Sequence, residues 1–369
     1  MNNTTTTIDF ANLSLAYQEH KADFDAAIGE VLSNSNYIMG EPISVLERKL
    51  GNFTGAKYAI SCSSGTDALL LALMAMDIQP GDEVITTPFT FIATAETIAF
   101  LKAKPVFVDI EETSYNINPA KIEEKITSRT KAIMPVSIFG QTADMDTVNA
   151  IAEKHNLIVI EDAAQSFGAT YKGKRSCNLS TFACTSFFPA KPLGCFGDGG
   201  AIFTSDEKFA EKIKSLRLHG QTQRYHHKYI GMGGRMDTIQ AAILNVKMDH
   251  YDKDIANRQR VAEEYSKQLS GSVITPMLLE TNTSVWAQYS IRVENREMIA
   301  KELKEAGIPT AIHYPKPLHL QECFEYLEYA KGDFPIAEKV SNEILSLPMN
   351  PYLKNEEIEY ISNQLKTAL

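Results

Sequence analysis

The chain has 369 residues, of which 44% are hydrophobic and 22% charged, a composition typical of globular proteins and not of disordered or fibrous ones. Its formal net charge of −10 argues against a general nucleic-acid-binding protein, because such binding depends on neutralising phosphates with basic side chains. The longest apolar run, residues 68–76, is too short to span a bilayer, and the N-terminus lacks the basic and apolar regions of a signal peptide. We therefore expect a cytoplasmic protein without nucleic-acid or membrane partners.

Short apolar runs alternate with helix-compatible stretches between residues 58 and 205, which predicts an α/β domain with a mostly parallel sheet. The runs begin at Tyr58, Val84, Val106, Ala132, Leu157, Phe182 and Ala201. Helices are predicted over residues 66–76, 94–102 and 145–155, and Asp67 and Asp146 lie in or near first turns, where the helix dipole favours acids. Ligands of such sheets bind beyond the carboxyl ends of the strands. Segments 63–66, 88–91, 162–165 and 186–191 all fall there.

The rest of the chain indicates a second, smaller unit. Segment 237–268 is helix-rich, with apolar residues at helical spacing at Ile239, Ile243 and Val246. A strand-like run follows over residues 285–293, then a helix near 296–306 and two further helical segments. We expect a large domain over residues 1–250, which includes an N-terminal helical segment, and a small α+β domain over residues 251–369.

Lys191 and Asp162 are the strongest candidates for chemistry. A lysine condenses with an aldehyde only as the free amine, so it needs an apolar pocket or a nearby cation to lower its pKa. Phe187, Phe188 and two prolines flank Lys191 and could provide the pocket. Asp162, at a separate strand end, would suit a protonated ring nitrogen of pyridoxal phosphate. Either residue alone is more often a surface lysine or a turn aspartate.

Segment 63–69 places hydroxyl residues and a glycine between a strand and an apolar helix, where backbone amides and the helix dipole can hold a phosphate. Gly65 and Thr66 are the candidates, although the same residues also make an ordinary helix N-cap. Neither G-x-G-x-x-G nor G-x-x-x-x-G-K-[ST] occurs, which removes the best support for a nicotinamide enzyme or a nucleotide hydrolase.

Segment 217–235 contains four Lys or Arg and three His but no Asp or Glu, so it is either an anion site or a solvated basic loop. His226 and His227 are adjacent and are poorly placed to share a metal. The five cysteines show no metal-binding or disulfide spacing. We therefore expect no metal. The pair His313–Tyr314 at a proline-bounded turn would by itself indicate a packed histidine.

Taken together, these segments resemble the DegT/DnrJ/EryC1/StrS family of pyridoxal-phosphate sugar aminotransferases over nearly the whole chain. Seven motifs follow in order, which makes chance agreement implausible. They are Tyr37-Ile-Met-Gly-Glu with Leu46-Glu-Arg-Lys-Leu, Ser64-Gly-Thr-Asp-Ala-Leu, Pro88-Phe-Thr-Phe-Ile-Ala-Thr, Glu161-Asp-Ala-Ala-Gln-Ser, residues 186–200, Arg235-Met-Asp-Thr-Ile-Gln-Ala-Ala, and residues 308–317.

The resemblance implies an aspartate-aminotransferase fold of type I, with a seven-stranded, mostly parallel sheet and a smaller α+β C-terminal domain. It implies that Lys191 carries pyridoxal 5'-phosphate as a Schiff base and later moves the proton between the sugar carbon and the cofactor. Asp162 would pair with the pyridinium nitrogen. The further contacts would be Gln165 near the ring hydroxyl, Phe91 on the ring face, and Gly65, Thr66 and Ser186 at the phosphate.

Lys191 and Gly233 are two positions at which members of this family differ. Relatives with histidine in place of the lysine perform dehydration, so Lys191 favours amino transfer. Many members have Asn two residues before the Arg of the Arg-Met motif, donated to the phosphate of the neighbouring subunit, whereas this chain has Gly233. The resemblance also implies a homodimer with shared active sites, segment 217–235 reaching across the interface.

The expected donor is glutamate and the expected acceptor a nucleotide-linked keto sugar. The resemblance is strongest to members that aminate C3 of UDP-2-acetamido-3-keto-glucuronate for surface polysaccharides, with substrate contacts from Arg235, His313, Tyr314 and His227. The alternatives are a 4-aminotransferase for a 4-keto-6-deoxy nucleotide sugar and, in another class, a non-catalytic regulatory protein of the same fold.

Overall fold

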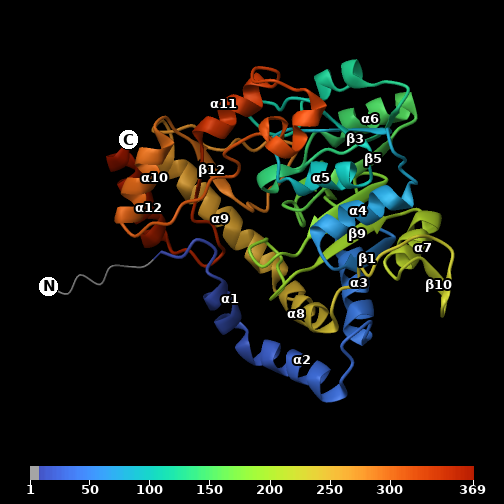
Figure 1. Ribbon diagram of the computed structural model, residues 1–369. Helices are drawn as coiled ribbons and strands as arrows, with labels where there is room; N and C mark the ends of the chain where they lie inside the picture. Colours follow the sequence, from blue (N-terminus) through green and yellow to red (C-terminus); the bar gives the residue numbers. More distant parts are fainter. Residues whose placement is uncertain (1–7) are drawn as a thin grey trace.

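A computed structural model describes residues 8–369 and is built around a seven-stranded sheet (Figure 1). The strand order is β1-β9-β8-β5-β4-β2-β3. Strand β9 runs antiparallel to both neighbours, and the remaining pairs are parallel, so the prediction of an α/β fold with a mostly parallel seven-stranded sheet is confirmed. The strands are β1 Tyr58–Cys62, β2 Glu83–Thr86, β3 Lys104–Phe107, β4 Thr130–Ile133, β5 Ile158–Asp162, β8 Phe182–Ser186 and β9 Gly200–Thr204.

Helices cover both faces of this sheet because alternate side chains of each strand point to opposite faces. In β8, Phe182 and Cys184 join the core beneath one helical layer, and Ala183 joins the core beneath the other. The first layer consists of α4 Gly65–Ala75, α5 Ala93–Phe100 and α7 Glu207–Leu216; the second consists of α3 Glu41–Thr54, α6 Met145–His155 and α8 Thr238–Met248.

Local signals explain where two of these helices begin. The Ser64 side chain accepts a hydrogen bond from the amide of Asp67 at 3.0 Å and starts α4. Asp144 accepts one from the amide of Thr147 at 3.2 Å and starts α6, whose last turn carries Lys154 and His155. The bounds of α6 are those predicted from the sequence.

The C-terminal part packs around a second core formed by α9, α10, α12 and a two-stranded sheet. The helix-rich segment after residue 237 is two helices, because α8 ends before Asp249 and α9 begins at Tyr251. The strand predicted over residues 285–293 is wrong in extent: Trp286 has a positive φ of 48°, and only Tyr289–Arg292 is extended. Its partner β13 was not predicted. The elements are α9 Tyr251–Leu269, β12 Tyr289–Arg292, α10 Arg296–Glu305, α11 Pro335–Glu343, β13 Ile344–Leu347 and α12 Asn355–Ala368.

Helix α9 contributes to both cores: Tyr251 packs with the large one and Tyr265 with the small one. A domain boundary at residues 250/251 coincides with the start of α9 and stays a prediction. No helix within residues 8–369 combines the length and the apolar character that crossing a membrane requires.

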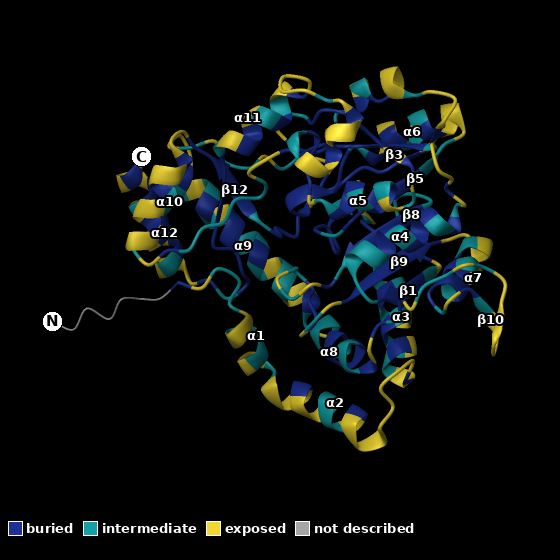
Figure 2. Ribbon diagram, viewed as in Figure 1, coloured by how far each residue is buried: buried dark blue, intermediate teal, exposed yellow. Residues whose placement is uncertain are grey.

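An N-terminal arm, made of α1 Leu13–Glu19 and α2 Lys21–Asn34, extends along the lower edge of the molecule and is largely exposed (Figures 1 and 2). Only Phe24 and Val31 of these two helices are buried. The remaining short elements are β6 Thr170–Tyr171, β7 Lys174–Arg175, β10 Gln221–Gln223, β11 His226–His227, and the 3-10 helices Pro119–Lys121, Glu123–Lys125, Ile138–Gly140, Leu318–Leu320 and Glu322–Leu327.

Candidate active site

The motifs singled out from the sequence meet at the carboxyl edge of the sheet. Strands β1 and β8 are parallel to each other through β9, so the turns that follow them lie on the same side. A Cβ on Gly65, after β1, would lie 2.6 Å from the Cβ of Ser186, at the end of β8. Asp162, the last residue of β5, accepts a hydrogen bond at 2.7 Å from the hydroxyl of Thr94, in α5 after β2. Four turns therefore form one site.

Lys191 and Asp162 form the ionisable centre of this site. Burial lowers the pKa of Lys191 from 10.5 to about 8, and the nearby Asp162 charge opposes part of this effect. Burial also raises the pKa of Asp162, and the hydrogen bonds from Thr94 and the Ala164 amide and the charge of Lys191 counteract it. About a tenth of the Lys191 amine is thus uncharged at pH 7 and about half at pH 8, and this free amine is the form that condenses with an aldehyde.

Reductive methylation of the protein without cofactor should reveal this shift. We expect the rate at Lys191 to increase with pH, to reach half of its maximum at about pH 8 and to level off above about pH 9, because the amine is then almost entirely free. Lys172 is the internal reference, since its pKa is raised by the carboxylate of Asp146 and its rate should keep increasing beyond that pH. Peptide mass spectrometry measures both lysines in one sample, and coincident profiles would contradict the assignment.

A cup of free backbone amides lies at the start of α4, against the end of β8. Helix α4 begins at Gly65, so the amides of Gly65 and Thr66 have no acceptor within the helix. The close approach of Ser186 leaves no room for a side chain at residue 65. Ser186 also accepts a hydrogen bond from the Phe188 amide at 3.2 Å, which orients its hydroxyl. The Ser64 side chain makes the N-cap, so the N-cap predicted for this segment is confirmed, and the phosphate site at Gly65 and Thr66 stays a prediction that is compatible with it.

Gln165, His313 and Tyr314 form a second polar group in the site, and His313 lies near enough to Lys191 to feel its charge. The Gln165 side-chain amide donates to the Tyr314 hydroxyl at 3.1 Å, and its oxygen accepts from the Phe139 amide at 2.7 Å. His313 bonds to the Ser346 hydroxyl at 2.9 Å, and burial together with the Lys191 charge lowers its pKa to about 4. His313 is therefore neutral at physiological pH. Phe91, with its ring centroid 6.2 Å from that of Tyr314, is 54% exposed at the edge of the site.

Arg235 borders the amide cup. The carbonyl of the preceding residue, Gly234, accepts a hydrogen bond from the Ser63 amide at 3.1 Å. The Arg235 Nε is buried and has no partner among the described residues, so this side chain can still donate to an anion. At Gly233, where many relatives carry Asn, a Cβ would lie 3.1 Å from the His219 ring, so an imidazole occupies the neighbouring space.

His227 is not part of the cluster within this chain. It lies in β11, in the short hairpin that projects from the edge of the molecule beside α7 (Figure 1). It is exposed, and its Nδ1 pairs with the His219 carbonyl oxygen at 2.9 Å. A sequence-based prediction could not place it, because the position of a hairpin relative to the sheet depends on contacts distant in sequence.

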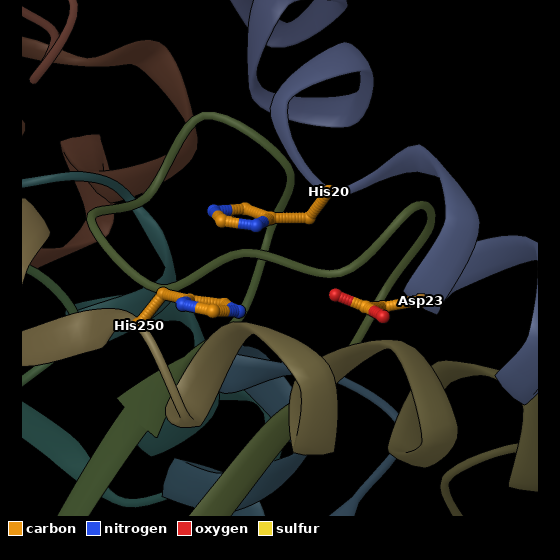
Figure 3. Close-up of side chains that lie close together, drawn as sticks. All are labelled: His20, Asp23 and His250. Carbon is orange, nitrogen blue, oxygen red and sulfur yellow. The ribbon is translucent and has the colours of Figure 1, made fainter.

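Thr94, Lys247 and a histidine pair were not recognised as notable from the sequence. His20 and His250 lie face to face beside Asp23, which docks α2 onto the start of α9 (Figure 3). The ring centroids are 3.7 Å apart with 8° between the planes. A metal binds a ring nitrogen in the ring plane at about 2.0–2.1 Å, so one ion cannot serve two parallel rings in this arrangement.

The site defines a class of enzyme: an α/β protein that condenses an aldehyde cofactor with a lysine facing a buried carboxylate at the carboxyl edge of the sheet. The family comparison makes this specific, since the DegT/DnrJ/EryC1/StrS aminotransferase family matches residues 18–366. The chain belongs to this family and is an aminotransferase that uses pyridoxal phosphate.

Individual relatives match over nearly their whole length. A UDP-2-acetamido-2-deoxy-3-oxo-D-glucuronate aminotransferase of Pseudomonas aeruginosa is 52% identical over 355 residues, 96% of this chain and 98% of that protein. The structure of S. venezuelae DesV in complex with a ketimine intermediate superposes with a TM-score of 0.96, at 36% identity and 98% coverage of both chains. NtdA from Bacillus subtilis with bound cofactor PMP gives a TM-score of 0.92 at 31% identity, covering all of this chain and 86% of that one.

The residues present fit this cofactor. A buried carboxylate with a raised pKa needs a cationic partner, which a protonated ring nitrogen would provide. The amide cup at Gly65 and Thr66 suits a phosphate at a helix N-terminus.

Proposed function

We propose that this aminotransferase moves an amino group from glutamate to C3 of UDP-2-acetamido-3-keto-glucuronate, within surface polysaccharide biosynthesis. The observation that carries the substrate assignment is the 52% identity to the Pseudomonas aeruginosa enzyme over 96% of the chain. The coarser assignment, amino transfer to a nucleotide sugar, is supported by the family as a whole.

Lys191 is proposed as the catalytic residue. When bound, pyridoxal phosphate supplies an electron sink that stabilises negative charge at the carbon that loses a proton. The Lys191 amine, with its pKa of about 8, binds the cofactor aldehyde and, once released, takes a proton from one carbon and returns it to another. Asp162 holds the positive charge of the ring nitrogen, which keeps the sink effective.

The remaining site residues would hold the cofactor and orient its ring. The amides of Gly65 and Thr66 and the Ser186 hydroxyl would bind the phosphate, while Gln165 would contact the ring hydroxyl. Phe91, exposed at the edge of the site, would cover the ring face and exclude water.

The extra carboxylate of a uronate is the feature by which this site would distinguish substrates. Arg235 has an unpartnered Nε and is proposed to bind a substrate anion. His313, held neutral, and Tyr314 would line the sugar pocket. His227 would contact substrate only from the hairpin of a neighbouring subunit.

A homodimer is part of the proposal. Tyr37, Ile38 and Met39 are consecutive and expose 46%, 52% and 38% of their surface, which supports a protein contact. They adjoin Arg235, because Ile38 pairs with Asp237. We also propose a cytoplasmic location, consistent with five free cysteines. Light scattering of the purified protein tests the dimer, and a monomer at micromolar concentration would contradict it.

Substrate preference tests the proposed function. With glutamate as donor, kcat/KM for the 3-keto uronate should exceed that for a 4-keto-6-deoxy nucleotide sugar by about 100-fold, the value of one or two charge-assisted hydrogen bonds. Preference for the 4-keto sugar would favour the alternative 4-aminotransferase. A protein that binds the cofactor but turns over neither sugar would favour the regulatory class.

Arg235→Ala should lower kcat/KM for the uronate about 100-fold, because a substrate carboxylate would lose its charged partner. The matched control is the same sugar nucleotide with a hydroxymethyl group in place of the carboxylate, for which the change should stay within about threefold. Cofactor affinity is measured in parallel by absorbance titration. Equal losses on both sugars would show that Arg235 does not select for the carboxylate.

A further inference from the structure

Two side chains of helix α8 form hydrogen bonds with the turn that carries Lys191. The Gln240 Oε1 accepts a hydrogen bond from the Phe196 amide at 2.9 Å, and the Lys247 Nζ donates to the Gly194 carbonyl at 2.5 Å. Gln240 and Lys247 are seven residues apart, about two helical turns, so both project from the same face of α8.

The surroundings of Lys247 are unusual for a lysine. Its ammonium lies 4.7 Å from the centroid of the Phe196 ring, and no carboxylate of residues 8–369 lies within 4.0 Å of it. Burial lowers the pKa of Lys247 to about 8, although Asp254 lies near enough to oppose this. Burying an amine without a salt bridge costs folding free energy. The one short hydrogen bond of Lys247, to the Gly194 carbonyl, therefore indicates that this carbonyl has a role.

The Gly194 carbonyl belongs to a tightly closed turn. The Cys195 amide donates to the Phe187 carbonyl at 2.7 Å, and the Lys191 amide donates to the Phe188 carbonyl at 2.8 Å. A Cβ on Gly194 would lie 2.5 Å from the Pro189 carbonyl oxygen. The turn therefore moves as one piece, and a displacement at Gly194 is transmitted to Lys191.

We propose that Lys247 is a positioning residue for Lys191. By binding the Gly194 carbonyl, Lys247 fixes the position and orientation of the turn from which the catalytic amine projects. Lys247 does not contact the reacting atoms. Misplacing a reacting group by about 1 Å can cost about 100-fold in rate, so a single strong hydrogen bond at the base of this turn has a measurable effect. The proposal rests on the proposed role of Lys191.

Three variants test the proposal. Lys247→Met keeps the length and apolar stem but cannot donate, and Lys247→Arg keeps a cationic donor. Lys49→Met is the control, because Lys49 also donates to a backbone carbonyl of α8, that of Asn245 at 3.0 Å, and pairs with Asp249 and not with the turn. If Lys247→Met yields no folded protein, Lys247→Leu, which is also apolar and cannot donate, takes its place.

The first measurement uses the protein without cofactor. Hydrogen exchange of amides in residues 187–196 should be about tenfold faster in Lys247→Met than in wild type, the expected effect of losing one charge-assisted hydrogen bond. Exchange in α12 should be unchanged, and Lys49→Met should match wild type in the turn. Equal exchange in wild type and Lys247→Met would overturn the proposal.

The second measurement is kinetic. Lys247→Met should lower kcat about tenfold while KM for the nucleotide sugar stays within twofold, and Lys247→Arg should recover at least half of the wild-type kcat. A residue that merely fills space would not be rescued by Arg, so an Arg variant no better than Met would contradict a positioning role. If wild type itself carries no cofactor on Lys191, the proposed function fails, whereas the exchange comparison still decides the role of Lys247.

Discussion

Lys191→Ala is expected to abolish the Schiff-base absorbance band of the protein after incubation with pyridoxal phosphate and removal of the free cofactor, and to lower kcat/KM on the order of 10⁴-fold or more. Both effects have one cause: the variant lacks the amine whose charge interacts with the buried carboxylate of Asp162. Without it the cofactor cannot be held covalently, and no group of suitable pKa remains to move the proton. Absorbance spectra and steady-state assays with glutamate measure the two effects.

The control for this experiment is Lys174→Ala, at an exposed lysine in the short strand β7. It should behave as wild type in both measurements. The fold should survive in Lys191→Ala, because removing a desolvated amine relieves part of its burial cost. A Lys191→Ala protein that remains yellow and turns over substrate at more than a few per cent of the wild-type rate would contradict the assignment.

Asp162→Asn is expected to lower kcat/KM about 100- to 1,000-fold, the usual cost of breaking a buried charge pair. Asn has the same shape and can still accept a hydrogen bond from Thr94, so the change removes mainly the negative charge. The ring nitrogen would then lose its proton more easily, and the cofactor would withdraw electrons less strongly. Kinetics and the pH dependence of the visible absorbance report the loss.

The adjacent carboxylate provides a matched control. Glu161 is also fully buried, but it faces the other side of the sheet and accepts hydrogen bonds from Ser137, Ser176 and the Cys177 amide. Glu161→Gln should lower the melting temperature while kcat per folded molecule stays within about threefold. If Glu161→Gln and Asp162→Asn lose activity equally, the effect at Asp162 is structural and not electronic.

Much of the fold could be predicted because its signals are local. The apolar runs and caps of the large domain identify strands and helices without reference to tertiary contacts, as Asp144 and the basic last turn of α6 illustrate. The strand edge that gathers Lys191, Asp162 and Gly65 follows from the parallel topology. The two-stranded sheet of the C-terminal part was less predictable, because β13 acquires its strand character from pairing with β12 about 55 residues earlier in the sequence.

The rest of the site depends on contacts between segments distant in sequence. Thr94 reaches Asp162 across 68 positions, and Lys247 reaches Gly194 across 53. Neither residue belongs to a pattern that distinguishes it from an ordinary helical threonine or lysine. His227 shows the opposite case, a residue that a sequence pattern did single out. It belongs to a basic segment that suggested an anion site, but composition could not show that this segment forms a hairpin projecting from the edge of the molecule.

Borohydride reduction of the wild-type protein bound to pyridoxal phosphate, followed by peptide mass spectrometry, tests the central claim most directly. Two lysines, Lys191 and Lys247, have a pKa lowered to about 8 by burial, so reactivity alone does not decide between them. We predict a pyridoxyl adduct on Lys191 at close to one per chain and none on Lys247. An adduct on Lys247 or on a surface lysine, with Lys191 unmodified, would contradict the account.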